Sequence, residues 1–110
     1  MRMMDKRLHI KVPRKAKQGE VVRLMTKLNH PMESGWRHLQ DGKAVPKDLV
    51  GNFICTLDGK EVFKAELESG TAGNPYLSFY VRVDKSGVFR FTWSGDNGES
   101  YQGEAPIEVV

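Results

Sequence analysis

The sequence predicts an all-β fold, an immunoglobulin-like antiparallel β-sandwich of about seven strands. Apolar and polar residues alternate along most of the chain, which is the period of half-buried strands. Turn residues recur roughly every 8–12 residues, and no segment sustains a helical period with caps. The 110 residues suit one domain, so we assign residues 1–110 to a single unit.

The first two strands are expected near the N-terminus. Apolar residues alternate over residues 8–12, and Pro13 ends that run because it cannot donate a backbone hydrogen bond. Gly19 marks a turn. The next run places Val21 and Met25 on one face. The opposite side carries Val22, Leu24, Thr26 and Leu28.

A central hairpin is predicted where residues 52–57 and 60–67 flank Asp58-Gly59, a pair typical of tight β-turns. With a two-residue turn, the expected partners are Leu57 with Lys60, Cys55 with Val62, and Ile54 with Phe63. This register places Phe53 and Val62 on one face and Ile54 and Phe63 on the other. The second apolar face is either covered by a loop or a surface for a partner.

The C-terminal half predicts two more regular strands, over residues 76–83 and 88–93. In the second of these, Phe89, Phe91 and Trp93 share one face, which is typical of a sandwich core. Residues 95–98 form a turn. Residues 99–109 are expected to give one or two short strands, broken by Pro106.

Two connections are long, one from Asn29 to about Gly51 and one over residues 69–75. Long loops on a rigid scaffold commonly carry binding residues. The first is rich in large side chains between His30 and His38. With two residues of the hairpin, it supplies the predicted partner-binding residues: His30, Met32, Trp36, Arg37, Phe53 and Val62.

The net charge is +3, and the cations are densest near the N-terminus. An anionic partner would explain them, but a solvated strand edge explains them better, because Lys deters edge pairing and no aromatic platform accompanies them. We therefore predict neither nucleic-acid nor membrane binding. No apolar run follows the first charged residues, so we expect no signal peptide of the chain's own.

Catalytic chemistry is sparse. The lone cysteine, Cys55, lies within an alternating β run, where a buried, inert thiol is the usual state. All three histidines, His9, His30 and His38, precede it, which is the wrong order for a blue-copper site. We predict no catalytic residue, metal or cofactor. The remaining functions are a scaffold subunit, a generic immunoglobulin-like accessory or adhesion module, or an enzyme that uses Cys55.

Four segments together resemble one family over nearly the whole chain. They are the His-Pro-Met…Gly…Arg loop of residues 30–37, Leu-Asp-Gly-Lys at 57–60, the Asn-Pro-Tyr-Leu segment within 73–79, and Phe-Thr-Trp with Asp-Asn-Gly within 91–98. In this order they are similar to SoxZ, a subunit of the bacterial sulfur-oxidation (Sox) carrier complex. The resemblance implies a non-catalytic subunit with an immunoglobulin-like fold.

The resemblance also implies partners. A SoxY-type subunit would form a heterodimer with this chain and carry thiosulfate-derived sulfur on the cysteine of a Gly-Gly-Cys-Gly-Gly arm. A cytochrome, a sulfate-releasing hydrolase and, in some organisms, a sulfur dehydrogenase would dock transiently. The complex would be periplasmic, exported with the partner. This chain has no such tail, since it ends in Ile107-Glu108-Val109-Val110.

Overall fold

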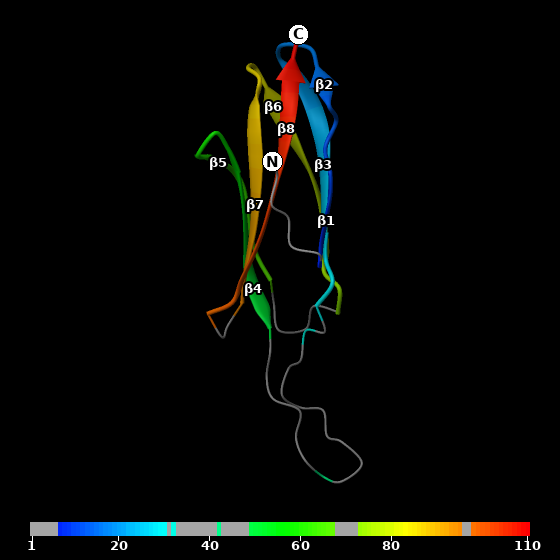
Figure 1. Cartoon of the computed structure of the whole chain (residues 1–110), viewed down its shortest axis with the longest axis vertical. Coiled ribbons are helices and arrows are strands. Elements are labelled where there is room, and N and C mark those ends of the chain that lie inside the picture. The colour runs from blue at the N-terminus through cyan, green and yellow to red at the C-terminus, as the bar shows by residue number, and fades with distance from the viewer. Residues whose placement is uncertain (1–6, 31, 33–41, 43–48, 68–72, 96–97) are drawn as a thin grey trace.

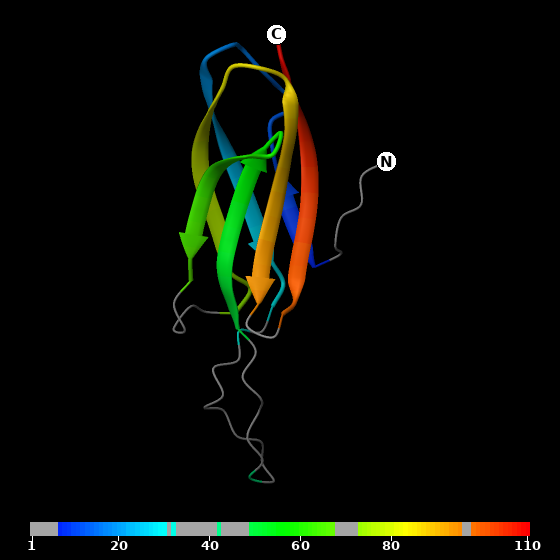
Figure 2. The same ribbon diagram turned by 90° about the vertical axis from the view of Figure 1, so that its left-hand side faces the viewer.

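Eight strands in two sheets make up the computed structural model of this chain, which describes residues 7–30, 32, 42, 49–67, 73–95 and 98–110. The three-stranded sheet has the order β1-β3-β6, and the five-stranded sheet has the order β2-β8-β7-β4-β5. The two sheets pack face to face (Figures 1 and 2), which confirms the predicted sandwich. The strands are β1 (Leu8–Lys11), β2 (Lys15–Ala16), β3 (Glu20–Leu28), β4 (Val50–Leu57), β5 (Lys60–Glu66), β6 (Tyr76–Val83), β7 (Gly87–Gly95) and β8 (Ser100–Val109).

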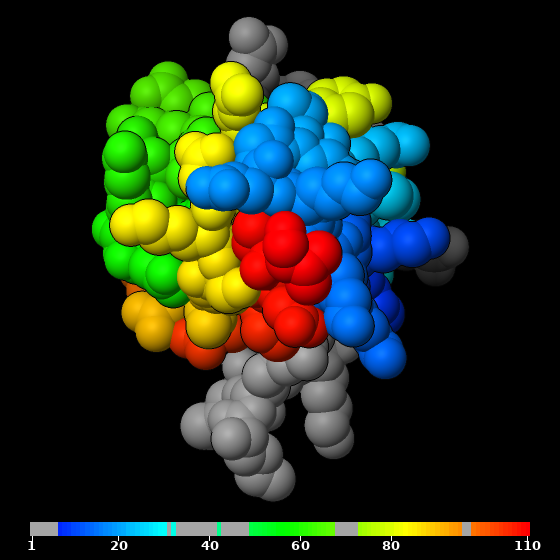
Figure 3. Space-filling view, turned by 90° about the horizontal axis from the view of Figure 1, so that it is seen from above, coloured from blue at the N-terminus to red at the C-terminus, as the bar shows by residue number. Residues whose placement is uncertain are grey.

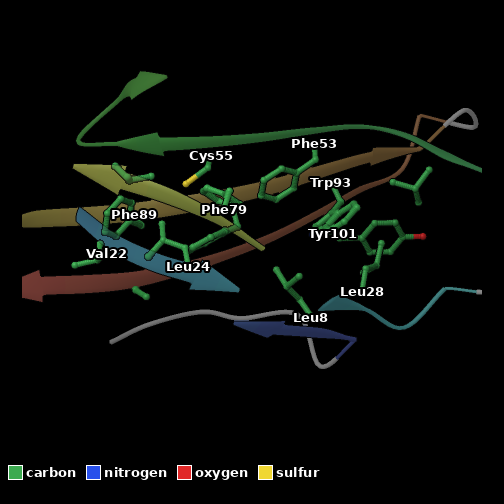
Figure 4. Close-up of a cluster of buried hydrophobic side chains, with 14 of the residues drawn as sticks. Leu8, Val22, Leu24, Leu28, Phe53, Cys55, Phe79, Phe89, Trp93 and Tyr101 are labelled. Atoms are coloured by element: carbon green, nitrogen blue, oxygen red, sulfur yellow. The ribbon is translucent and has the colours of Figure 1, made fainter. Parts of the chain in front are cut away.

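The core follows from the alternation in the sequence. On β3 one alternating set is buried, Val22, Leu24, Thr26 and Leu28, and β6 and β7 bury alternate residues in the same way. Trp93 and Phe53 have no exposed surface and their ring centroids lie 4.7 Å apart (Figure 4). Burial of a large apolar side chain contributes about 2–3 kcal/mol. Phe53, on β4, also meets Phe79, on β6 of the other sheet, with ring centroids 5.8 Å apart, so this aromatic cluster joins the two sheets.

One buried hydrogen bond joins the sheets. The indole Nε1–H of Trp93, on β7, donates to Oγ1 of Thr26, on β3, at 3.2 Å. Both residues are almost wholly buried. A buried indole N–H needs a hydrogen-bond acceptor. Thr26 supplies that acceptor, which explains why a polar residue lies on the otherwise apolar inner face of β3.

The predicted turn of the central hairpin is confirmed. Asp58 and Gly59 have φ values of 49° and 85°, which both central residues of a type I′ turn require. Asp58 also fastens the hairpin to β7: its N–H donates to the Val88 carbonyl at 3.1 Å, and its Oδ1 accepts from the Val88 N–H at 2.9 Å. A Cβ on Gly87 would lie 2.6 Å from Asp58 Oδ2, so the close approach needs glycine there.

The predicted register holds for the two pairs next to the turn, Leu57 with Lys60 and Thr56 with Glu61, and is wrong beyond them. Cys55 pairs with Phe63, and Ile54 with Lys64, because a β-bulge inserts Val62 as an extra residue. Phe63 is therefore turned toward the core, and its ring stacks on Phe79 of β6 at 4.2 Å with an angle of 7° between the planes. The second apolar face of the hairpin is thus reduced to Ile54.

The predicted break at Pro106 is also wrong, because β8 is one continuous strand. Pro106 lies opposite Val88, whose N–H and C=O both point to Asp58 on the other side of β7. A residue opposite such a position makes no ladder bond to β7, so the missing N–H of proline costs nothing there. The sequence also gave no sign of the two-residue β2, which pairs in parallel with the end of β8.

Candidate partner-binding site

Both long connections leave the sandwich at the same end. There β3, β5 and β7 end and β4, β6 and β8 begin, as Figures 1 and 2 show. The connections run between Leu28 and Val50 and between Glu66 and Tyr76, close to the predicted limits. The opposite end, seen in Figure 3, is closed by short turns and by the C-terminal Val110, whose N–H donates to the Ala16 carbonyl at 2.9 Å. The loop-bearing end is therefore the candidate site.

The two connections are tied together where they begin and end. The His30 N–H donates to Oδ1 of Asn74 at 3.0 Å, and the Asn74 N–H donates to the His30 carbonyl at 2.6 Å. The Met32 N–H donates to Nδ1 of His30 at 3.0 Å, which makes that nitrogen an acceptor. The Val50 N–H in turn contacts the Met32 sulfur at 3.4 Å. We call these four residues, His30, Met32, Val50 and Asn74, the loop root.

The backbone of the loop root adopts an unusual conformation. Met32 and Asn74 have φ values of 52° and 54°, in the left-handed region that few residues other than glycine occupy. Asparagine tolerates this conformation, whereas an unbranched apolar residue adopts it at some cost. The hydrogen bonds of the loop root hold both residues in this conformation.

Aromatic and cationic groups pack beside the loop root. The His30 ring meets the Tyr101 ring edge-on at 5.9 Å, and the Arg7 guanidinium lies over the Tyr101 ring at 4.4 Å. The Tyr101 hydroxyl donates to the Glu99 carboxylate. These contacts join Arg7 and the start of β8 to His30 of the loop root.

The structure places the six predicted partner-binding residues differently from one another. His30 and Met32 are only 3% and 7% exposed, and Phe53 has no exposed surface. These three side chains are interior residues in this chain alone, and their part in partner binding stays a prediction. Val62 is half-buried at the bulge. Trp36 and Arg37 lie outside the described residues, so their part in partner binding stays a prediction.

Sequence reasoning missed Asn74 and Tyr101, which complete the surroundings of His30. The Asn-Pro pair at 74–75, placed directly before a strand, was the available signal, because asparagine before a turn often bonds neighbouring backbone. Tyr101 carried none, since an alternating strand does not reveal what its inward residues touch.

The single thiol is buried, as predicted. Cys55 has no exposed surface and faces the core, with its sulfur 4.0 Å from the Thr56 carbonyl oxygen. Desolvation raises the pKa of the Cys55 thiol to about 12. At pH 7 about one molecule in 10⁵ would carry the thiolate, the reactive form.

Among the described residues, no three His, Cys, Asp or Glu side chains converge as ligands for a metal ion. In the same part of the chain, no helix has the length and apolar character needed to cross a membrane.

A family model described as "Sulphur oxidation protein SoxZ" matches residues 10–106. The search of curated proteins returns no match. Among solved structures, the sulfur carrier protein SoxY from Chlorobium limicola f thiosulfatophilum has 15% identity and a TM-score of 0.67, with 96% of this chain and 81% of that chain covered.

Superoxide reductases (neelaredoxins) are also similar. The protein from Ignicoccus hospitalis has 17% identity and a TM-score of 0.71, with 94% of this chain and 80% of that chain covered. The reduced protein from Archaeoglobus fulgidus has 19% identity and a TM-score of 0.60, with 93% and 89% covered. At these identities the likeness shows a shared fold and nothing about chemistry.

Proposed function

This chain belongs to the SoxZ family, and on that premise we propose that it is the non-catalytic scaffold subunit of a sulfur-carrier heterodimer in thiosulfate oxidation. The partner is a SoxY-type subunit whose Gly-Gly-Cys-Gly-Gly arm holds the sulfur covalently. The sulfur-oxidation cytochrome, the sulfate-releasing hydrolase and, in some organisms, a sulfur dehydrogenase dock transiently on the pair. The complex works in the periplasm, to which this subunit is exported with its partner.

The state of Cys55 is the observation that carries the proposal. A cysteine that accepts and releases sulfur must be exposed and readily ionised. Cys55 is wholly buried in a strand, and burial raises its pKa to about 12. The one thiol of this chain is therefore unsuited to carry sulfur, which supports placing the carrier cysteine on another subunit.

The architecture supports a scaffold role. A mobile arm needs a rigid base, and the sandwich supplies one through its aromatic core and the Trp93–Thr26 hydrogen bond. The loop root binds His30 and Met32, at the start of the long first connection, to the sandwich. Trp36 and Arg37 of that connection are the proposed contacts with a partner.

Co-expression with a SoxY-type subunit tests the proposal. At micromolar concentration, gel filtration is expected to give one complex that contains both chains. Trp36→Ala and Arg37→Ala are expected to weaken the complex while the urea midpoint of the isolated chain stays unchanged. Two separate peaks for the unaltered chains would refute the heterodimer, and unfolding of the isolated chain by Trp36→Ala would refute its assignment as a contact.

The carrier assignment and the location have separate tests. After incubation with the loading cytochrome and thiosulfate, intact-mass spectrometry is expected to show added sulfur on the partner and none on this chain. Cell fractionation is expected to find this chain in the periplasm only when the partner keeps its own export signal. Sulfur on Cys55 of the folded complex, or export without the partner, would contradict the respective part of the proposal.

A further inference from the structure

The outer face of the three-stranded sheet has an unusual composition. β1 and β3 lie at the right in Figure 1, and the strand registers give the residues that point away from the core. No Asp or Glu is among them. We call this set the basic-aromatic face: His9, Lys11, Val21, Arg23, Met25, Lys27, Tyr76, Ser78, Tyr80 and Arg82.

Large apolar groups on this face are open to solvent. Tyr80 is 68% exposed, Val21 is 56% exposed and Tyr76 is 48% exposed. Tyr80 lies directly opposite Arg23, and Tyr76 directly opposite Lys27, so each tyrosine has a basic residue as its cross-strand neighbour. Tyrosine, arginine and methionine are the residues enriched in protein–protein interfaces.

Two cations of this face, Arg23 and Lys27, have no acidic partner among the described residues. Arg23 donates from Nε to the Ser78 hydroxyl at 2.8 Å, and in the described part of the chain neither it nor Lys27 forms an ion pair. The outer face of the other sheet differs, because there Arg90 pairs with Glu104 at 2.6 Å. Arg23 and Lys27 therefore leave uncompensated positive charge on the basic-aromatic face.

A shallow, mostly apolar hollow of about 150 Å³ opens on the same face. Met25, His9, Lys11 and Tyr76 are among the residues that line it. Its size suits a single inserted side chain, and pockets that take one anchor residue commonly dominate interface energetics. An apolar anchor surrounded by carboxylates would match both the hollow and the charges around it.

We propose that the carrier subunit docks on the basic-aromatic face, through an acidic surface that inserts one apolar side chain into the hollow. This inference rests on the proposed heterodimer and adds the face by which it forms. A protein fits better than a nucleic acid, because the exposed Val21 and the half-buried Met25 offer nothing to phosphates. Charge complementarity of this kind speeds association and makes binding depend on salt.

Charge reversal on the face tests the proposal in the co-expressed pair. Arg23→Glu with Lys27→Glu is expected to raise the dissociation constant for the carrier subunit at least roughly tenfold at low salt, an effect that shrinks as NaCl is added. Tyr80→Ala is expected to weaken binding by roughly tenfold, as for a central interface tyrosine. Lys64→Glu with Lys85→Glu, the same charge change on exposed positions elsewhere, should leave binding within about twofold.

The outcomes distinguish failure of the proposed docking face from failure of the proposed heterodimer. If the unaltered chain does not bind the carrier subunit at all, the proposed function fails. If it binds and the Arg23/Lys27 and Tyr80 variants bind equally well, this face is not the docking surface. The inference is also overturned if those variants lose only affinity for a single-stranded oligonucleotide, or only self-association of this chain. Circular dichroism and the urea midpoint of each variant report whether it folds.

Discussion

Thr26→Val removes the hydroxyl that accepts the Trp93 indole N–H across the two sheets. Valine has nearly the same shape and suits a β-strand, so packing around position 26 changes little. The indole N–H then stays buried, because both residues are at most 1% exposed and water cannot reach it. The variant thus isolates one hydrogen bond from the apolar contacts around it.

The magnitude follows from that burial. Leaving a buried donor unsatisfied costs about 1–3 kcal/mol, and we take about 2 kcal/mol as the expected loss in the free energy of unfolding. With an unfolding entropy of about 2.1 cal/mol/K per residue, the 110 residues give about 0.23 kcal/mol/K. Thr26→Val is therefore expected to lower Tm by about 9 °C.

Urea unfolding followed by Trp fluorescence, together with calorimetry, measures the loss. A double-mutant cycle with Trp93→Phe supplies the control, because phenylalanine has no N–H to satisfy. In that background Thr26→Val should change the stability by less than about 0.5 kcal/mol. An equal loss in both backgrounds would refute the reasoning, and so would a Thr26→Val variant as stable as the unaltered chain.

Three further predictions concern the hairpin and the thiol. Gly87→Ala should lower the free energy of unfolding by about 1–2 kcal/mol, because the new Cβ displaces the Asp58 carboxylate from the Val88 N–H; in an Asp58→Gly background the urea midpoint should hardly respond to it, and an equal loss there would contradict the clash. Burial raises the pKa of the Cys55 thiol in the folded state from 9.0 to about 12. The stability that the folded chain gains from this raised pKa is therefore fully present below pH 9 and is lost as the pH rises toward 12. Between pH 9 and 11 the unaltered chain should lose up to about 1.4 kcal/mol per pH unit more than Cys55→Ala; parallel curves would contradict the raised pKa. Iodoacetamide should label Cys55 at pH 8 only after unfolding in urea.

Local patterns predicted most of the fold. The inward residues of β3, β6 and β7 follow a strict period of two, and Asp58-Gly59 is compatible with few turns other than the one observed. The register beyond the turn could not be predicted, because a bulge adds one residue that leaves no mark on composition. What decides it is the stacking of Phe63 on Phe79, a contact with another sheet.

The candidate site was predictable in position but not in detail. Loop length alone located the end of the sandwich that carries it. The burial of His30 and Met32 was not visible, because the alternation stops at Leu28 and burial beyond it depends on Asn74, about 44 residues later in the chain. His30 and Met32 are therefore part of the loop root, and this position depends on contacts that no local pattern encodes.

Pro106 has a consequence for the solubility of the protein. Backbone groups along the outer edge of β8 would otherwise offer a template for strands of other molecules, the usual route to edge-to-edge aggregation. Pro106 has no N–H to offer there, and the next outward donor, the Glu108 N–H, already bonds to the Arg14 carbonyl at 2.9 Å. A foreign strand therefore meets two consecutive positions without a free donor. Side chains of the chain can still bind a specific partner, whereas the backbone at this edge offers no free donor for non-specific strand pairing.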